Sequence, residues 1–219
     1  MRSPISRPRW PFFADGIMRP FPIYIMLVFL LFSCGNNSTG PEHSLSADRD
    51  VLVALYNATN GTNWTNKTNW LTDNDLSTWH GITISNERVI FLNLANNNLT
   101  GEFPGALGNL SDLKTLNFSD NQLHGPIPSE LGNLSNLTDL YLSRNALSGS
   151  VPSELSNLSN LTGLHLDQNG LTGPLPQSLT NLTNLKEFIF QDTELCAPLN
   201  AAFQTWLQGI PLFTGDNCQ

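Results

Sequence analysis

The sequence predicts an α/β repeat solenoid, in which a parallel sheet lines the concave side of a coil and a cap closes each end. Three observations predict this fold: a 24-residue repeat, alternating apolar and polar residues at the start of each repeat, and non-repeating segments on both sides. Self-similarity with a period of about 20–50 residues is the signature of a solenoid.

Four successive blocks follow the frame LxxLxLxxNxLxGxIPxxLGxLxx without a gap. They are residues 89–112, 113–136, 137–160 and 161–184, and a fifth block begins at Leu185 before the frame decays. Apolar residues that alternate with polar ones, such as Leu140 and Leu142, have the period of a half-buried strand. Each block therefore supplies one short strand, and consecutive blocks place their strands side by side and parallel.

The other recurrent residues have structural explanations. The ninth position of each block is an asparagine, whose amide can satisfy buried backbone groups of the turn after the strand. A glycine at the thirteenth position allows a tight bend, and a proline at the sixteenth fixes an extended return path. The asparagines are Asn97, Asn121, Asn145 and Asn169.

The frame resembles the plant-type leucine-rich repeat found in receptor-kinase ectodomains, in polygalacturonase-inhibiting proteins and in exported bacterial proteins. The resemblance covers about residues 47–219. It implies a short right-handed coil with a parallel concave β-sheet, and it implies binding rather than catalysis.

The N-terminal cap is expected over residues 47–88. Residues 47–58 have helical spacing, with Ser46 as the expected N-cap residue. Plant versions of this cap often carry a cysteine pair near the last tryptophan, and this chain has none there. Aromatic packing is the expected substitute, with carbohydrate stacking as the alternative, and the aromatic residues are Trp64, Trp70 and Trp79.

The terminal repeat and C-terminal cap are expected over residues 185–219. The asparagine position is occupied by Thr193, and a short helix is expected around residues 200–207. In an exported protein the pair Cys196 and Cys218 predicts a disulfide. A loop of about 22 residues closed in this way is stabilised by about 3 kcal/mol.

The first 33 residues predict a secretory signal. Arginines precede an apolar run over residues 20–32, which is shorter than the ~20 residues that a membrane-spanning helix needs. A start at Met18 would give a more typical signal. The run ends in Leu-Phe-Ser-Cys-Gly, which resembles a bacterial lipoprotein signal and implies a lipid anchor on Cys34.

Residues 34–46 then form the lipidated cysteine and a flexible tether. This interpretation predicts an exported protein, anchored to a membrane at the cell surface or outer membrane. The alternative is a secreted protein in which Cys34 is an ordinary thiol beside the cleavage site.

Charge and motifs exclude several functions. From Cys34 onward the chain has six Lys/Arg and seventeen Asp/Glu, a net charge of −11, which disfavours nucleic acid as a partner. No HExxH, CxxC, GxSxG or phosphate-binding loop is present, so we expect no enzyme, no catalytic residue and no cofactor. The segment 73–75 lacks the glycine and glutamate of a calcium loop, so no metal is expected.

The remaining candidates are the outward positions of the concave strands, at frame positions three, five, seven and eight. Six of them are the expected ligand-binding residues, and the partner is a protein, a peptide or a glycan: Asp120, Asp139, Tyr141, Arg144, His165 and Asp167. Two alternatives remain. The protein is a structural or adhesive envelope protein that acts by self-association, or it inhibits a wall-degrading enzyme.

Overall fold

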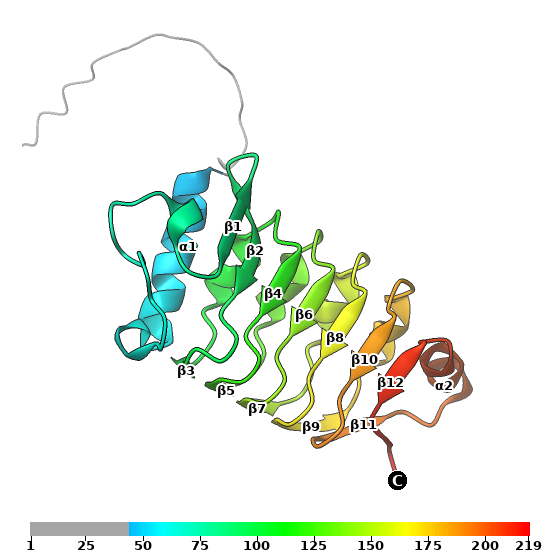
Figure 1. Cartoon of the computed structure of the whole chain (residues 1–219). Coiled ribbons are helices and arrows are strands. Elements are labelled where there is room, and N and C mark those ends of the chain that lie inside the picture. The colour runs from blue at the N-terminus through cyan, green and yellow to red at the C-terminus, as the bar shows by residue number, and fades with distance from the viewer. Residues whose placement is uncertain (1–43) are drawn as a thin grey trace, which may run out of the picture. The chain divides into compact units, whose positions relative to one another are not determined.

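The computed structural model describes residues 44–219, which form a solenoid with a helix at each end (Figure 1). Each coil consists of a concave strand, a turn, a second short strand and a 3-10 helix on the convex side. The predicted α/β repeat solenoid is therefore confirmed. Cys34 and the expected signal and tether up to residue 43 lie outside the described residues.

The concave sheet has seven strands in the order β1-β2-β4-β6-β8-β10-β12. Their bounds are β1 Ile82–Ser85, β2 Arg88–Asn93, β4 Thr115–Asn117, β6 Asp139–Tyr141, β8 Gly163–His165, β10 Glu187–Ile189 and β12 Leu212–Thr214. The pair β1 and β2 is antiparallel, and every later pair in this sheet is parallel. The sequence analysis foresaw the five strands of the repeats, whereas β1 and β12 belong to the caps and carry no frame.

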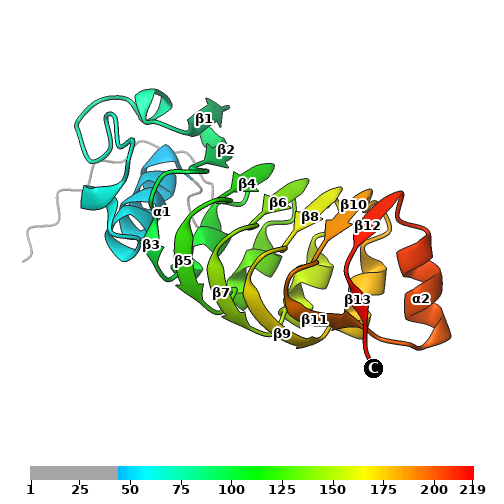
Figure 2. The same cartoon turned by 60° about the horizontal axis from the view of Figure 1, so that its bottom comes forward.

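A second sheet follows the turns, where the sequence analysis expected only bends and an extended return path (Figure 2). Its order is β13-β11-β9-β7-β5-β3. The bounds are β3 Thr100–Gly101, β5 Gln122–Gly125, β7 Ala146–Gly149, β9 Gly170–Pro174, β11 Glu194–Ala197 and β13 Asp216–Asn217. The polar, glycine-rich segments pair because the coil brings each one beside its counterpart in the next repeat.

Short 3-10 helices line the convex side, and each of the four in the repeats begins after a proline. Their bounds are η3 Gly105–Asn109, η4 Ser129–Asn133, η5 Ser153–Asn157 and η6 Gln177–Asn181. Neighbouring coils approach closely here. A Cβ atom on Gly132 would lie 2.4 Å from the backbone oxygen of Glu154, which explains the glycine there; the later repeats have Ser156 and Thr180 at the same frame position.

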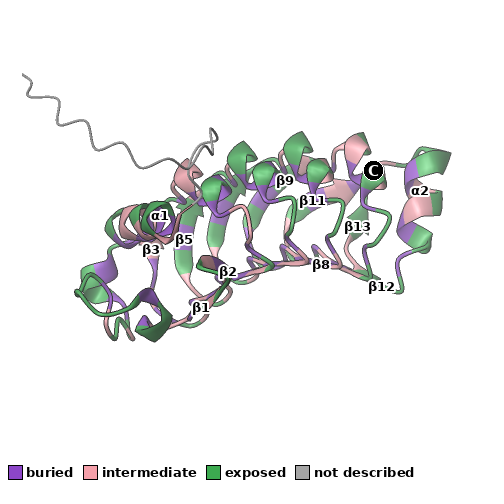
Figure 3. Cartoon of the chain, turned by 90° about the horizontal axis from the view of Figure 1, so that it is seen from above, coloured by how far each residue is buried: buried purple, intermediate pink, exposed green. Residues whose placement is uncertain are grey.

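The core lies inside the coil, between the two sheets and the 3-10 helices (Figure 3). The frame leucines are fully buried in it. The asparagine ladder is also present as predicted: Asn121 Oδ1 accepts hydrogen bonds from the backbone N–H groups of Asn97 and Leu99, and its Nδ2 donates to the carbonyls of Leu94 and Phe118.

The N-terminal cap contains helix α1, Leu45–Ala58, and two 3-10 turns, η1 Gly61–Asn63 and η2 Leu76–Thr78. The helix begins earlier than expected, because Ser44 and not Ser46 accepts the capping hydrogen bond, from the N–H of Ala47. Asp48 is buried and forms an ion pair with Arg88 at the start of β2, at 2.9 Å. This pair attaches the helix to the first strand of the repeats.

Three tryptophans of the N-terminal cap form an aromatic cluster with Tyr56, as the sequence analysis expected. Trp64 and Trp70 pack edge to face with ring centroids 4.7 Å apart, and Trp70 lies 4.9 Å from Trp79. All three are buried, so their rings are not available to stack on a carbohydrate.

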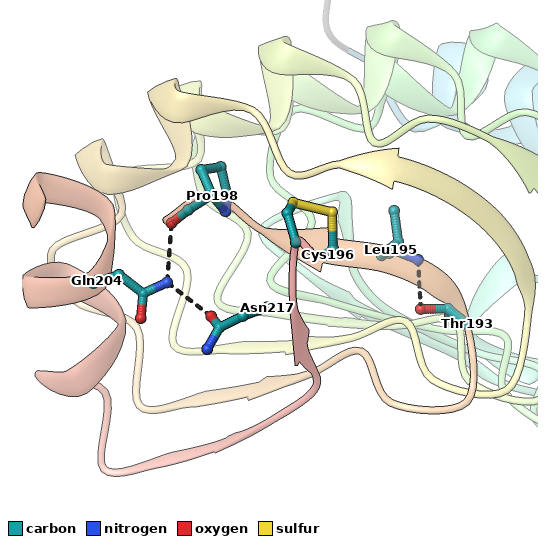
Figure 4. Close-up of a disulfide and its surroundings, with 7 residues drawn as sticks. Thr193, Leu195, Cys196, Pro198, Gln204 and Asn217 are labelled. Carbon is teal, nitrogen blue, oxygen red and sulfur yellow. Dashed lines mark hydrogen bonds between the residues drawn. A yellow bond between two sulfur atoms is a disulfide. The ribbon is translucent and has the colours of Figure 1, made fainter. Parts of the chain in front are cut away.

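The C-terminal cap contains helix α2, Ala201–Gln208, with Asn200 as its N-cap residue. The predicted disulfide joins Cys196 to Cys218 and links β11 to the end of the chain (Figure 4). Gln204 of α2 donates hydrogen bonds to Pro198 and Asn217 on the two sides of this disulfide. Within residues 44–219, no helix combines the length and apolar character needed to cross a membrane.

Candidate functional site

Four rows of outward-facing side chains cover the concave sheet, because the strands pair in strict register. The first row is Phe91, Thr115, Asp139, Gly163, Glu187 and Leu212. The second row is Asn93, Asn117, Tyr141, His165, Ile189 and Thr214. The third row is Ala95, Ser119, Ser143, Asp167 and Gln191, and the fourth is Asn96, Asp120, Arg144, Gln168 and Asp192.

The fourth row has a backbone conformation of its own. All five residues have φ between 53° and 56°, in the left-handed region that non-glycine residues rarely adopt. This turn ends each strand, and backbone hydrogen bonds hold it, for example from the N–H of Arg144 to the carbonyl of Asp167 in the next coil. The backbone conformation is thus fixed while the side chain type changes from coil to coil.

Near the middle of the face, side chains gather over Gly163; we call Asp139, Tyr141, His165 and Glu187 the Gly163 cluster. The Tyr141 hydroxyl donates to Asp139 Oδ1 at 3.1 Å, and the Tyr141 and His165 rings lie 4.6 Å apart. His165 Nε2 lies 3.1 Å from Glu187 Oε2. A side chain at Gly163 would crowd this arrangement, since its Cβ would lie 3.0 Å from Asp139 Oδ1 and Asp139 would have to shift.

The surroundings of Tyr141 raise the pKa of its phenol to about 12. The main cause is partial burial, and the negative charge of Asp139, its hydrogen bond and the charge of Glu187 add to it. All of these disfavour the tyrosinate. Tyr141 is therefore a neutral hydrogen-bond donor throughout the physiological pH range.

The six residues that the sequence analysis named do not form one group. Asp139, Tyr141 and His165 meet in the Gly163 cluster. Arg144 and Asp120 pair separately at the edge of the face, with Nη1 and Oδ1 3.2 Å apart. Asp167 is only 8% exposed, and the Ser143 hydroxyl donates a hydrogen bond to it.

Sequence reasoning left Glu187 out of the named set. The signal was available, because Glu187 occupies the same frame position as Asp139, two coils further on.

A hollow of about 480 Å³ lies at the N-terminal end of the concave face. Apolar and polar groups line it, from β1, β2 and the segment just before β1: His80, Gly81, Ile82, Thr83, Phe91, Asn93 and Ala95. Phe91 is 37% exposed and so offers an apolar surface beside this hollow. The frame did not reveal this hollow, because one of its walls is β1, outside the repeats.

The chemistry that this face offers is recognition of polar and cationic groups beside apolar ones. Five carboxylates and one guanidinium lie in the four rows. The Tyr141 hydroxyl and the His165 ring nitrogen contact two of those carboxylates. Among residues 44–219, no group of three or more His, Cys, Asp or Glu side chains is arranged to hold a metal ion.

Models of known protein families match the repeats. A leucine-rich-repeat model matches residues 91–147, and a second one, also described as a leucine-rich repeat, matches residues 160–182.

Several solved structures share the fold. A plant ice-binding protein is 31% identical with a TM-score of 0.71, over 78% of this chain and 56% of that one. The structure of PEPR1 with AtPEP1 is 27% identical with a TM-score of 0.67, over 78% and 25%. The Arabidopsis receptor kinase HAESA, in complex with the peptide hormone IDA and the co-receptor SERK1, is 26% identical with a TM-score of 0.56, over 75% and 32%. The chain thus spans between a quarter and about half of these proteins.

Proposed function

The chain is a leucine-rich-repeat protein of the plant type, and from this premise we propose that it is an exported recognition module. In this proposal the concave sheet binds an extended segment of a protein or peptide. The residues that carry the binding are those named from the sequence, together with Glu187: Asp120, Asp139, Tyr141, Arg144, His165, Asp167 and Glu187.

One observation carries the proposal: most outward positions change from coil to coil while the frame around them does not. The strands hold fully buried leucines at constant positions, for example Leu116, Leu140 and Leu164. The second row between them changes from Asn117 to Tyr141 and then to His165. Because the side chains of Tyr141 and His165 hydrogen-bond only to other side chains of this face, their chemistry is available for a ligand.

The dimensions of the face favour an extended ligand. Six spacings of ~4.8 Å between seven strands, and four residues at ~3.3 Å along each strand, give a projected patch of ~380 Å². A standard protein–protein interface needs ~800 Å² on each partner. A peptide, or one loop of a larger protein, fits the smaller area.

The similarity to HAESA supports a peptide as the ligand class, since that receptor was solved with a peptide hormone. The similarity to an ice-binding protein shows that this fold serves more than one ligand. The side chains of this chain, rather than its fold, must therefore identify the partner.

The location belongs to the same proposal. The signal-like first 33 residues and Cys34 predict export and a lipid anchor at the cell surface or outer membrane. The similarity to solved ectodomains of plant receptor kinases supports export.

Affinity capture tests the proposal. The immobilised chain is exposed to cell-surface and secreted fractions beside a Tyr141→Ala, Arg144→Glu variant and a control variant, His124→Ala, Glu154→Lys. The control residues are exposed and lie off the concave sheet. We expect a partner that the parent and the control capture and that the concave-face variant loses while its circular dichroism spectrum is unchanged. Equal capture by all three chains would contradict the proposal.

Self-association is the second candidate, and the last strand of the concave sheet favours it. Strand β12 has a partner on one side only, and two apolar residues are exposed on it: Leu212 is 49% and Phe213 38% exposed. An unpaired edge with apolar side chains is a template for pairing with another chain. Sedimentation velocity at increasing concentration, with Phe213→Lys as the comparison, decides whether this edge joins copies of the chain.

A further inference from the structure

We propose that the ligand of the concave sheet is a basic extended peptide that runs along the first row. A Lys or Arg of this peptide binds over Gly163, and apolar residues on either side of it contact Phe91 and Leu212. The inference rests on the proposed function and adds the chemistry of the partner.

The first row is apolar at both ends and acidic between them. Register places Phe91 on β2 at one end and Leu212 on β12 at the other, with Asp139 and Glu187 between. Phe91 borders the hollow of about 480 Å³, which has room for an apolar side chain. Leu212 is 49% exposed. An apolar side chain at each end of a ligand would cover surface that the fold leaves open to water.

Gly163 lies between the two acidic residues, since it pairs with Asp139 on β6 and with Glu187 on β10. Because the glycine has no side chain, Asp139 Oδ1 and the Tyr141 hydroxyl lie over β8, 3.0 and 3.1 Å from where a Cβ would be. Glu187 pairs directly with Gly163 on the next strand. Its charge reaches the Tyr141 phenol, since it contributes to the raised pKa of that group.

Asp139 has hydroxyl partners but no cation. It accepts hydrogen bonds from Thr138 at 2.8 Å and Tyr141 at 3.1 Å. Among residues 44–219, no Lys, Arg or His nitrogen lies within 4 Å of it, and Glu187 pairs only with His165. A ligand ammonium or guanidinium over Gly163 would contact both carboxylates, and the ring of Tyr141 would add a cation–π contact.

Two lysines restrict the approach of this cation. Lys114 and Lys186 are exposed and stand one residue before the first row, on the side from which the strands begin. They repel a ligand cation from that side. The ligand cation therefore lies toward Tyr141 and His165, on the other side of the row.

The register also fixes the spacing of the ligand. From Phe91 to Gly163 there are three strand steps, or ~14 Å, and from Gly163 to Leu212 two steps, or ~10 Å. An extended peptide advances ~3.3 Å per residue. Because alternate side chains of an extended peptide share a face, the basic residue should stand four residues from the apolar residue that contacts Phe91 and two residues from the one that contacts Leu212, in either chain direction.

A library of random octapeptides, selected on the full chain, tests this chemistry. We expect selected peptides to share one Lys or Arg flanked by apolar residues at the two spacings above. In a synthetic selected peptide, replacing the Arg with uncharged citrulline, or a Lys with norleucine, should weaken binding about tenfold or more, the usual effect of losing a charge-assisted contact.

Matched variants of the chain locate the contact. Asp139→Asn and Glu187→Gln should each weaken the basic peptide about tenfold, while Asp192→Asn, which removes an equal charge from the fourth row, should change binding less than about twofold. Phe91→Ser should abolish the preference for one apolar residue of the peptide.

The possible outcomes separate the two proposals. Suppose that the selected peptides bind the parent chain, do not bind the Tyr141→Ala, Arg144→Glu variant, and contain no basic residue. This result would overturn the inference and leave the proposed function standing. Selected peptides that bind that variant and the parent equally would overturn both. A library that yields no binding peptide would also overturn the inference, and capture of a glycan by the parent would then identify a different ligand class.

Discussion

At the scale of single residues, the asparagines at the ninth frame position stabilise the coil more than the asparagines exposed on its surface do. Asn169 is buried: its Oδ1 accepts from the N–H of Leu147, and its Nδ2 donates to the carbonyls of Leu142 and Leu166. A buried backbone group that loses its partner costs ~1–3 kcal/mol, because water cannot replace the bond. The asparagine therefore satisfies groups that no other side chain reaches.

Asn169→Ala should lower the free energy of unfolding by about 3 kcal/mol, because it leaves several backbone groups unpaired. The matched control is Asn184→Ala in the same repeat, whose Nδ2 makes an exposed bond to the carbonyl of Ser159 at 2.8 Å. The control should cost less than about 1 kcal/mol, since water replaces that bond. Urea denaturation measures both, and similar losses in the two variants would contradict this explanation of the ladder.

Tyr141 should titrate well above an ordinary tyrosine. With its pKa raised to about 12, mainly by burial, it should remain mostly protonated at pH 11, where a tyrosine of pKa ~10 is mostly ionised. Tyrosinate absorbance compared between the parent and Tyr141→Phe isolates this group, and Asp139→Asn should lower its pKa. Because the folded pKa is the higher one, the contribution of Tyr141 to stability is complete below pH ~10 and is lost between about 10 and 12. Full ionisation of the Tyr141 phenol at pH 11 in the folded protein would contradict the raised pKa.

The sequence identified the position of candidate site residues better than their contacts. Frame position alone showed that Tyr141 and His165 are neighbours on adjacent strands, and their rings lie 4.6 Å apart. It could not show that Asp167 is nearly buried, because its depth depends on Ser143 in the previous coil. Nor could it reveal the exposure of Phe91, which depends on β1.

At the scale of elements, the strands of the repeats, the cap helices and the disulfide were predicted, whereas the strands of the caps were not. A period can be read from one sequence, so the five strands of the blocks were foreseen. The caps have no period, and β1 and β12 form because the ends of the sheet offer unpaired backbone groups. In the last coil Thr193 occupies the asparagine position and satisfies backbone groups of the turn. Its hydroxyl accepts a hydrogen bond from the N–H of Leu195 and donates one to the carbonyl of Phe190.

Removing the disulfide should loosen the C-terminal cap and leave the first repeats intact. Cys196→Ser, Cys218→Ser opens a link with a sequence separation of 22 and should cost about 3 kcal/mol. Each coil of a solenoid contacts only its neighbours, so the loss should begin locally. Hydrogen exchange should accelerate over residues 194–217 and stay unchanged over 89–136. Faster exchange spread evenly along all the coils would contradict the local role.

At the scale of the whole molecule, the caps make a short solenoid stable and the rows make it selective. The two ends of a solenoid expose core surface, and a cap must cover each of them. The ion pair of Asp48 with Arg88 attaches the N-terminal cap, and the Cys196–Cys218 disulfide attaches the C-terminal cap. Between them the binding rows can change from coil to coil without altering the core, since the outward positions contribute little to it.

The anchor decides where this surface works. If Cys34 carries lipid, the chain should partition into the detergent phase of a bacterial membrane extract, and Cys34→Ser should move it to the aqueous phase, because the acyl chains supply most of the membrane affinity. Cys218→Ser is the matched control, because it removes a cysteine that the anchor does not use. Intact mass should show the lipid on the parent and on the control but not on Cys34→Ser. A parent without added mass, found in the aqueous phase, would instead identify a secreted recognition protein with the same binding face.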